Sequence, residues 1–99
     1  VSEEKIYRTQ ITLAELARRL NIRQHQLSEL LNAYMKTTFA NYFNDLRVDE
    51  AKHLLLSSPE MQIIEISLEV GFNSLSVFYR EFKKRVGVSP AEFRKKLVA

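Results

Sequence analysis

Side chains that carry out covalent or metal chemistry are scarce in this chain of 99 residues. It has no cysteine, and its two histidines, His25 and His53, fall in different predicted helices, so no thiolate site or histidine cluster is expected. The sequence contains no glycine-rich phosphate loop, no G-x-S-x-G nucleophile elbow and no pair of carboxylates with a plausible pocket. The sequence therefore indicates a protein that is not an enzyme and that binds no metal or cofactor.

The polar side chains that remain are hydrogen-bonding groups gathered in two short stretches. The first, residues 23–29, offers guanidinium, amide, imidazole, hydroxyl and carboxylate groups. The second, residues 73–84, offers amide, hydroxyl, phenol, guanidinium and ammonium groups. Such mixtures suit recognition of a polar or charged partner, and what they can contact depends on the elements that position them.

Those elements are predicted to be helices, because the chain has only two glycines and two prolines and few runs that alternate with period two. Thr12 and Glu15 form a capping box that starts the first helix. Its apolar face consists of Leu13, Leu16, Ala17 and Leu20. A second helix starts near Arg23, and its apolar face consists of Leu27, Leu30, Leu31 and Tyr34.

A long third helix is predicted after Thr38, over about residues 39–56, with a length of roughly 25 Å. Its apolar residues stay near one face and comprise Phe39, Tyr42, Phe43, Leu46, Ala51, Leu54 and Leu55. Gly71 ends a fourth helix, and Gly87 ends a fifth that Asn73 or Ser74 caps. Ser89-Pro90-Ala91-Glu92 starts a sixth helix with both a capping box and proline at the first position.

The pattern of the first half returns in the second half. Residues 12–22 match residues 62–72 at an offset of 50, and one inserted residue then shifts the offset to 51. A four-helix bundle has the same periodicity, but the tight turn before each second helix, with small Ala17 or Ser67, favours two tandem helix-turn-helix units. We therefore expect one domain over residues 1–99, with units at 12–37 and 61–99 and a connecting helix at 38–57.

Charge is distributed unevenly along the chain, whose formal net charge is +3. Residues 12–47 carry five positive and three negative charges, and residues 48–77 carry one positive and five negative. Residues 78–99 carry seven positive and two negative charges, a net of +5. This basic quarter could steer the chain toward a polyanion, while an ordinary solvated helix face is the alternative explanation.

A long, correctly spaced signature occupies the second half of the chain. It consists of Ile66-Ser67-Leu68-Glu69-Val70-Gly71-Phe72-Asn73-Ser74, then Phe78, Arg80, Phe82-Lys83-Lys84, Gly87, Ser89-Pro90 and Phe93-Arg94. With these residues the chain resembles the AraC/XylS family of bacterial transcription regulators, and residues 13–55 resemble the family more loosely. Glu29 stands where the family often has a basic residue, and Ser67 stands where it commonly has alanine.

The resemblance implies an all-α fold of about seven helices, with two helix-turn-helix units joined by a long helix. It also implies a cytoplasmic transcription activator that binds a double-stranded DNA operator sequence-specifically and meets RNA polymerase. A covalently attached sensing or dimerisation domain is expected outside this chain, which starts at Val1 rather than at methionine. No membrane contact is expected of this domain, because its longest apolar runs are far too short to span a bilayer.

The second helix of each unit is then expected to enter the major groove with its N-terminal residues closest to the bases. The first reading helix presents Gln24, His25, Ser28 and Glu29, and Arg23 is expected at phosphate. Glutamine pairs with adenine, and glutamate accepts from the cytosine amino group. Two alternatives remain for Glu29, a solvated acid or an ion pair with Arg23 or Lys36, because phosphates repel a carboxylate. For His25 the alternative is a plain surface histidine.

The second reading helix is expected to present Leu75, Ser76, Tyr79 and Arg80. Arg80 is the strongest candidate, since arginine forks onto O6 and N7 of guanine. A salt bridge from Arg80 to Glu69 or Glu81 is the alternative, and Leu75 and Tyr79 have a second interpretation as core residues. The predicted phosphate contacts of this unit are Asn73, Ser74, Lys83 and Lys84.

A helical protein-interaction module is the main competing function. The acidic middle segment suits such a surface, toward RNA polymerase or a sensing domain, alongside DNA binding. Retention on DNA with salt elution separates the two functions, since a pure interaction module should show no sequence-dependent DNA binding.

Overall fold

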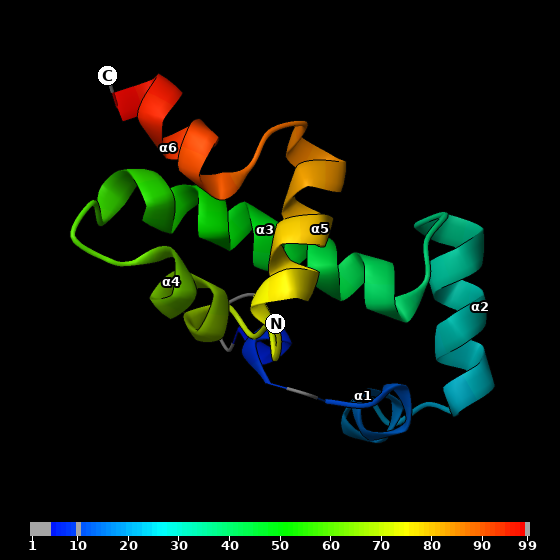
Figure 1. Cartoon of the computed structure of the whole chain (residues 1–99). Coiled ribbons are helices and arrows are strands. Elements are labelled where there is room, and N and C mark those ends of the chain that lie inside the picture. The colour runs from blue at the N-terminus through cyan, green and yellow to red at the C-terminus, as the bar shows by residue number, and fades with distance from the viewer. Residues whose placement is uncertain (1–4, 10, 99) are drawn as a thin grey trace.

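The computed structural model describes residues 5–9 and 11–98, and all regular structure in this part of the chain is helical (Figure 1). In chain order the elements are η1 (Ile6–Arg8, a 3-10 helix), α1 (Leu13–Arg19), α2 (Gln24–Tyr34), α3 (Phe39–Ser57), α4 (Ile63–Glu69), α5 (Leu75–Val86) and α6 (Pro90–Val98). The all-α prediction is confirmed. None of these helices is both long and apolar enough to cross a membrane. The ends of the predicted domain, residues 1–4 and 99, lie outside the described residues.

Three predicted helix starts have the expected capping hydrogen bonds. At α1 the Thr12 hydroxyl accepts from the Glu15 N–H at 3.1 Å, and the Glu15 carboxylate accepts from the Thr12 N–H at 3.3 Å. Ser89 and Glu92 make the same reciprocal pair before α6, at 3.1 Å in both directions. Before α3 the Thr38 hydroxyl accepts from a backbone N–H at 3.2 Å. These bonds satisfy N–H groups that a helix leaves without an internal partner, so the helices begin at these residues.

The two units repeat each other in backbone conformation as well as in apolar pattern. Asn21 and Gly71, which follow the first helix of each unit 50 residues apart, have positive φ angles of 60° and 111°. Lys36 and Gly87, which follow the second helices 51 residues apart, have φ angles of 55° and 94°. These are the offsets of the sequence repeat, and a left-handed residue at such a position ends a helix. The duplication therefore extends into the turns.

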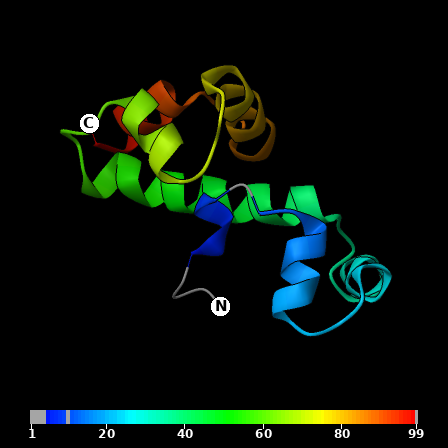
Figure 2. The same cartoon turned by 90° about the horizontal axis from the view of Figure 1, so that it is seen from below.

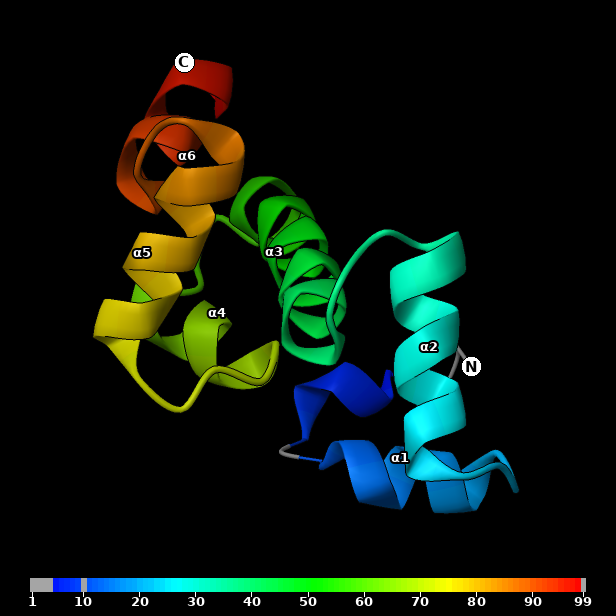
Figure 3. The ribbon, with the colours of Figure 1, turned by 90° about the vertical axis from the view of Figure 1, so that its right-hand side faces the viewer.

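Two hydrophobic cores lie on opposite sides of α3 (Figures 2 and 3). The first joins η1, α1, α2 and the start of α3, and its buried residues are Tyr7, Ile11, Leu16, Ala17, Leu27, Leu31 and Phe43. The second joins the rest of α3 to α4, α5 and α6, and its buried residues are Val48, Ala51, Leu55, Ile66, Val70, Phe72, Phe78, Phe82 and Phe93. α3 therefore contributes residues to both cores, and its position sets how the two units lie relative to each other.

The apolar faces of three helices differ from the sequence prediction. Leu20, Leu30 and Tyr34, predicted to face inward, are exposed, Tyr34 over 78% of its surface. α1 and α2 pack mainly on each other, so only the positions that meet the partner helix are covered. Nor does α3 have a single apolar face. Phe43 packs in the first core and Leu55 in the second, about 120° apart around a helix of 3.6 residues per turn.

The segment around η1 bridges the two units, which the sequence pattern did not indicate. Arg8 pairs with Glu50 of α3 and donates to Glu69 of α4 at 2.7 Å. Arg47 of α3 donates to the carbonyl oxygen of Tyr7 at 2.6 Å. Burial alone would raise the pKa of the Glu50 carboxyl, but hydrogen bonds led by that from Arg8 outweigh burial and lower it. A charged cluster thus ties the N-terminal segment to both sides of the molecule.

Candidate nucleic-acid interface

The predicted reading residues of the first unit lie on the outer side of α2. Gln24, His25 and Glu29 are exposed, and Ser28 is half-buried. Gln24, His25 and Ser28 line a shallow hollow together with Leu13 of α1. Three of the four predicted side chains therefore share one surface, at the N-terminal end of the helix.

Glu29 holds its carboxylate in solvent. No ion pair joins it to Arg23 or to Lys36, the partners considered from the sequence, or to any other residue that the structure describes. The ion-pair interpretation is therefore wrong. A carboxylate in this state can accept a hydrogen bond from a base amino group, and it repels phosphate.

Basic side chains surround the turn of the first unit. Arg23 is exposed at the N-cap of α2, where its backbone N–H donates to the Gln26 side chain at 2.9 Å. Arg18 of α1 is also exposed, and both arginines line a second hollow with Asn21 and Ile22. Arg23 was predicted from the sequence and Arg18 was not, although a cation at the end of the first predicted helix is a visible signal. Together they suit an anionic group such as phosphate.

Three of the four predicted reading residues of the second unit are exposed on α5. Ser76 and Arg80 are open to solvent, and Tyr79 is 40% exposed while its ring lies 6.0 Å from that of Phe78. Leu75 is half-buried and packs against the second core, which agrees with its alternative interpretation as a core residue. The outer face of α5 is thus polar and aromatic near its N-terminal end.

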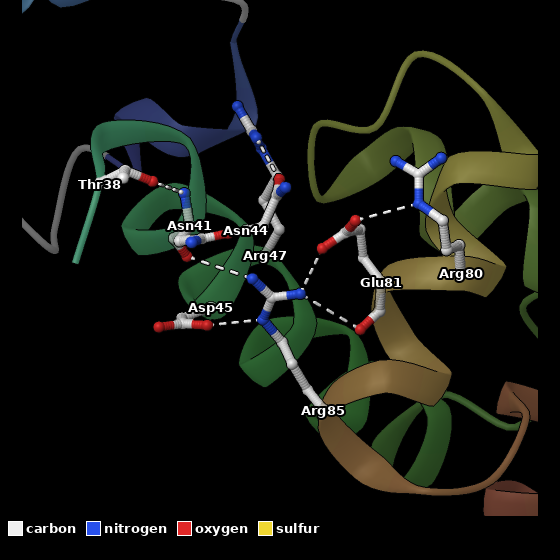
Figure 4. Close-up of polar contacts among 8 residues, drawn as sticks. All are labelled: Thr38, Asn41, Asn44, Asp45, Arg47, Arg80, Glu81 and Arg85. Carbon is white, nitrogen blue, oxygen red and sulfur yellow. Dashed lines mark hydrogen bonds and ion pairs between the residues drawn. The ribbon is translucent and has the colours of Figure 1, made fainter.

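Arg80 forms the salt bridge that the sequence left open. Its Nε donates to Oε2 of Glu81 at 3.2 Å, whereas Glu69 is paired with Arg8. In Figure 4 the two terminal nitrogens of Arg80 point away from Glu81, and 69% of the side chain is exposed. Those nitrogens carry donors in a planar fork, so the ion pair leaves Arg80 able to bind a pair of acceptors.

Glu81 belongs to a cluster that joins α5 to α3 (Figure 4). Arg85 donates to the Glu81 carboxylate, to Asp45 of α3 at 2.5 Å, and to the Asn41 carbonyl oxygen at 3.4 Å. The hydrogen bond from Arg85 lowers the pKa of the Glu81 carboxyl despite burial. Burial alone would lower the pKa of Arg85, but Asp45 and Glu81 raise it. This cluster was not predicted, although Glu81 and Arg85 have the i, i+4 spacing of a helical ion pair.

The predicted phosphate contacts of the second unit flank its reading face. Ser74 caps α5, and its hydroxyl oxygen accepts from the Val77 N–H at 3.3 Å, which leaves the hydroxyl hydrogen to donate elsewhere. Asn73 is exposed beside it, and Lys83 and Lys84 are exposed further along the helix. These donors and cations border Arg80 at both ends.

Two arginines of the basic last quarter are committed to internal hydrogen bonds. Arg85 is only 16% exposed. Arg94 donates to the carbonyl oxygens of Leu55, Ser58 and Met61 at 2.9, 3.1 and 2.8 Å, around the C-terminal end of α3. Both side chains fix helices in place, so the positive charge available to a partner is smaller than the sequence count suggests.

Comparison with known proteins finds similar chains. A family model described as a helix-turn-helix domain matches residues 16–96. The chain is 33% identical over 84 residues to the HTH-type transcriptional regulator CdhR of Pseudomonas aeruginosa, a match covering 85% of this chain and 25% of the relative. It is 35% identical over 82 residues to the arabinose operon regulatory protein of Escherichia coli (strain K12), covering 83% and 28%. The chain thus spans about a quarter of the length of these curated relatives.

Solved structures share the arrangement of helices. The C-terminal domain of AraT, a response regulator from Geobacillus stearothermophilus, is 32% identical with a TM-score of 0.85, and the match covers 94% of this chain and 77% of that one. A transcriptional regulator from Chromobacterium violaceum with an AraC-type DNA-binding domain is 26% identical with a TM-score of 0.81, covering 87% and 76%.

Proposed function

Because this chain belongs to the AraC/XylS family of helix-turn-helix transcription regulators, we propose that it binds its DNA operator by inserting α2 and α5 into two successive segments of the major groove. The observation that carries the proposal is the orientation of these two helices. They run in the same direction, with their N-terminal ends toward the same side of the molecule (Figures 1 and 3). Since such helices read bases with their N-terminal residues, both can approach one face of a duplex.

The dimensions of the molecule support a spacing of one DNA turn. The longest dimension of the molecule is 46 Å, and α3, which separates the units, has 19 residues. A helix of that length is roughly 28 Å long. Successive segments on one face of a duplex lie ~34 Å apart, so one chain is long enough to reach two of them.

In the second unit, Arg80 is the proposed reader of guanine, and Ser76 and Tyr79 are proposed to contact neighbouring positions. Leu75 has only a partly exposed edge to offer a thymine methyl group. The phosphate contacts proposed here are Asn73, Ser74, Lys83 and Lys84.

In the first unit, Gln24 is the proposed reader of adenine, with His25 and Ser28 beside it, and Arg23 is proposed at phosphate together with Arg18. Glu29 has two possible effects with opposite signatures. If it accepts from a cytosine, Glu29→Ala loses about 1–3 kcal/mol on the best site only. If it is repelled, Glu29→Ala tightens binding to every sequence, most at low salt, where the Debye length reaches ~30 Å at 0.01 M. We propose the second effect, because no described residue holds Glu29 toward a base.

The proposal extends to the protein in its cell. The relatives named above are transcription regulators, a family of DNA-binding proteins rather than of enzymes. We propose a cytoplasmic activator that contacts RNA polymerase and carries its sensing or dimerisation domain outside this chain. The proposal of a further domain is supported by the small share of each relative that the chain matches, 25% and 28% in the two cases above.

Selection of bound sites from random DNA, followed by footprinting, tests the proposal. One chain should protect two major-groove segments about one turn apart on one face of the duplex. A footprint confined to one segment, or a need for two chains to cover two segments, would refute the two-helix mode. A complete lack of sequence preference would instead favour the interaction-module function.

Substitutions in α5 test how readers and anchors are assigned. Arg80→Ala should cost about 1–3 kcal/mol on the best site and relax preference at one base pair. Lys84→Ala should weaken all sequences alike and lower the salt slope by about one. If both variants weaken specific and random DNA equally, Arg80 does not read a base.

We also propose that the second unit dominates affinity, because its reading face itself carries a cation, Arg80, that is 69% exposed, whereas the reading face of the first unit carries the unpaired acid Glu29. The comparison is between a double variant of each unit, His25→Ala with Glu29→Ala and Ser76→Ala with Arg80→Ala. The second double variant should weaken operator binding more. Equal losses would contradict this ranking.

A further inference from the structure

Glu81 is the single acidic residue of α5 and lies between two arginines. It is buried, with 7% of its surface exposed, on a helix whose outer face is proposed to meet DNA. Oε2 accepts from Nε of Arg80, and Oε1 accepts from Arg85 (Figure 4). A carboxylate near a DNA-binding surface weakens general attraction to phosphate, so its position beside Arg80 needs a reason.

The contact between Arg80 and Glu81 does not follow from helix geometry. Neighbouring residues of a helix project roughly 100° apart and do not face each other, unlike residues spaced i, i+3 or i, i+4. The Arg80 side chain must therefore bend around the helix, toward the side of Glu81, to bring Nε within 3.2 Å of its carboxylate. Because Nε is then occupied, a fork onto guanine has to use the two terminal nitrogens.

The other oxygen of Glu81 is held by a group that is itself fixed. Arg85 is anchored on α3 by Asp45 and by the Asn41 carbonyl oxygen, and it also donates to the carbonyl oxygen of Glu81. The carboxylate therefore has a defined position before any partner arrives. A continuous set of polar contacts runs from α3 through Arg85 and Glu81 to the guanidinium of Arg80 (Figure 4).

We propose that Glu81 is a positioning residue for DNA specificity, which aims the terminal nitrogens of Arg80 at the base pair that Arg80 reads. The inference rests on the proposed function, in which Arg80 contacts a base. An arginine that is already oriented loses less conformational freedom on binding, so more of its hydrogen-bond energy is available to discriminate bases. Because 69% of the Arg80 side chain is exposed to solvent, its attraction to Glu81 adds little to stability, so orientation is the larger effect of this contact.

This role predicts opposite changes in specific and general binding. Glu81→Ala releases the Arg80 guanidinium, so preference at its base pair should fall by about 2- to 12-fold, the range expected for one side chain that must be ordered on binding. The same change removes a negative charge, so affinity for random duplex should rise. Glu60→Ala, a variant of an exposed acid outside α5, is the charge-matched control and should change only general affinity.

The experiment measures dissociation constants on three duplexes: the best selected site, that site with the Arg80 base pair replaced, and a random duplex. The variants are Glu81→Ala, Arg80→Ala, their double variant and the control. If Glu81 acts through Arg80, Glu81→Ala causes no further loss of preference in the Arg80→Ala background. An unchanged preference in Glu81→Ala, or an equal loss with and without Arg80, overturns the inference. If Arg80→Ala itself changes preference at no base pair, the proposed function of Arg80 fails instead.

A measurement on the unsubstituted protein covers the case in which Glu81→Ala does not fold. The Nε–H of Arg80, identified by NMR from its disappearance in Arg80→Ala, should exchange with water more slowly than those of Arg18 and Arg19. Both reference arginines are exposed on α1. Exchange as fast as theirs would overturn the inference, because Arg80 would then have no lasting hydrogen bond to orient it.

Discussion

Replacing Gly71 with alanine should displace the N-terminal segment from the junction of the two units. At Gly71 φ is 111°, and an added Cβ would meet the Tyr7 carbonyl oxygen and lie 2.7 Å from Cα of Arg8. These are backbone atoms, which cannot swing aside as the end of a side chain can. Gly87→Ala is the matched control, because φ is 94° there and no atom beyond the two neighbouring residues lies within 4 Å of the Cβ position.

The two substitutions should lower the free energy of unfolding by different amounts. The positive φ costs an alanine ~1–2 kcal/mol, and the lower freedom of the unfolded chain offsets ~0.4–1 kcal/mol, so Gly87→Ala should lose about 1 kcal/mol of unfolding free energy. Gly71→Ala carries the same cost and also moves Arg8 away from the buried carboxylate of Glu50. Leaving a buried charge without its partner costs ~3–5 kcal/mol. This is a large fraction of a typical stability of ~5–15 kcal/mol.

Urea unfolding followed by circular dichroism measures both free energies, provided that the slope with urea is unchanged. We expect Gly71→Ala to be less stable than Gly87→Ala by about 3 kcal/mol or more. Arg8→Ala should then add little in the Gly71→Ala background, since its contacts are already broken. Equal losses in the two glycine variants would refute the reasoning, because they would show that the N-terminal segment does not hold the junction.

Three further predictions concern acid, the connecting helix and its end. The lowered carboxyl pKa values of Glu50 and Glu81 mean that their stabilisation is complete above the ordinary pKa of ~4.3 and is lost as pH falls below it. The melting temperature should therefore be level from neutral pH to about pH 5 and fall below that pH. The fall should be less steep in Glu50→Gln than in the unsubstituted protein, and an equally steep fall in the two proteins would contradict this prediction. Val48→Pro removes a backbone donor inside α3 and should lower the free energy of unfolding by ~3 kcal/mol or more, with a parallel loss of DNA binding. An unchanged melting temperature would show that α3 is not continuous at Val48. Arg94→Lys keeps the charge but loses the hydrogen bonds to three backbone carbonyl oxygens. The melting temperature should therefore fall by an amount equivalent to ~1–3 kcal/mol of unfolding free energy. An unchanged melting temperature would show that these carbonyl groups do not need the guanidinium.

The helix starts and stops could be predicted from the sequence because their signals are local. The Thr12 and Ser89 capping boxes involve residues three positions apart, and Gly87 has a conformation that few other residues adopt. The repeat offsets also followed from local patterns. In contrast, the exposure of Leu30 and Tyr34 depends on which neighbour covers α2, and periodicity does not contain that information.

The contacts between distant residues could not be predicted. No local pattern in the sequence marks Arg8, which pairs with acids 42 and 61 residues away. Leu75 was open to two interpretations because it lies at the edge of the polar face of α5. The sequence identified Arg80 and named Glu81 as a possible partner, but only the fold brings Arg85 and Asp45 together behind them.

The docking of η1 also bears on the order in which a ribosome can complete this fold. Arg8 is synthesised 61 residues before its partner Glu69, an interval of about 3–12 s at common rates of synthesis. α1 and α2 contact each other over short sequence distances, so the hairpin they form can assemble during this interval. The segment around η1 is therefore fixed late, once the turn at Gly71 has been synthesised and can cover it. During synthesis, the side of the first unit next to η1 therefore stays exposed until the chain has been made as far as the turn at Gly71.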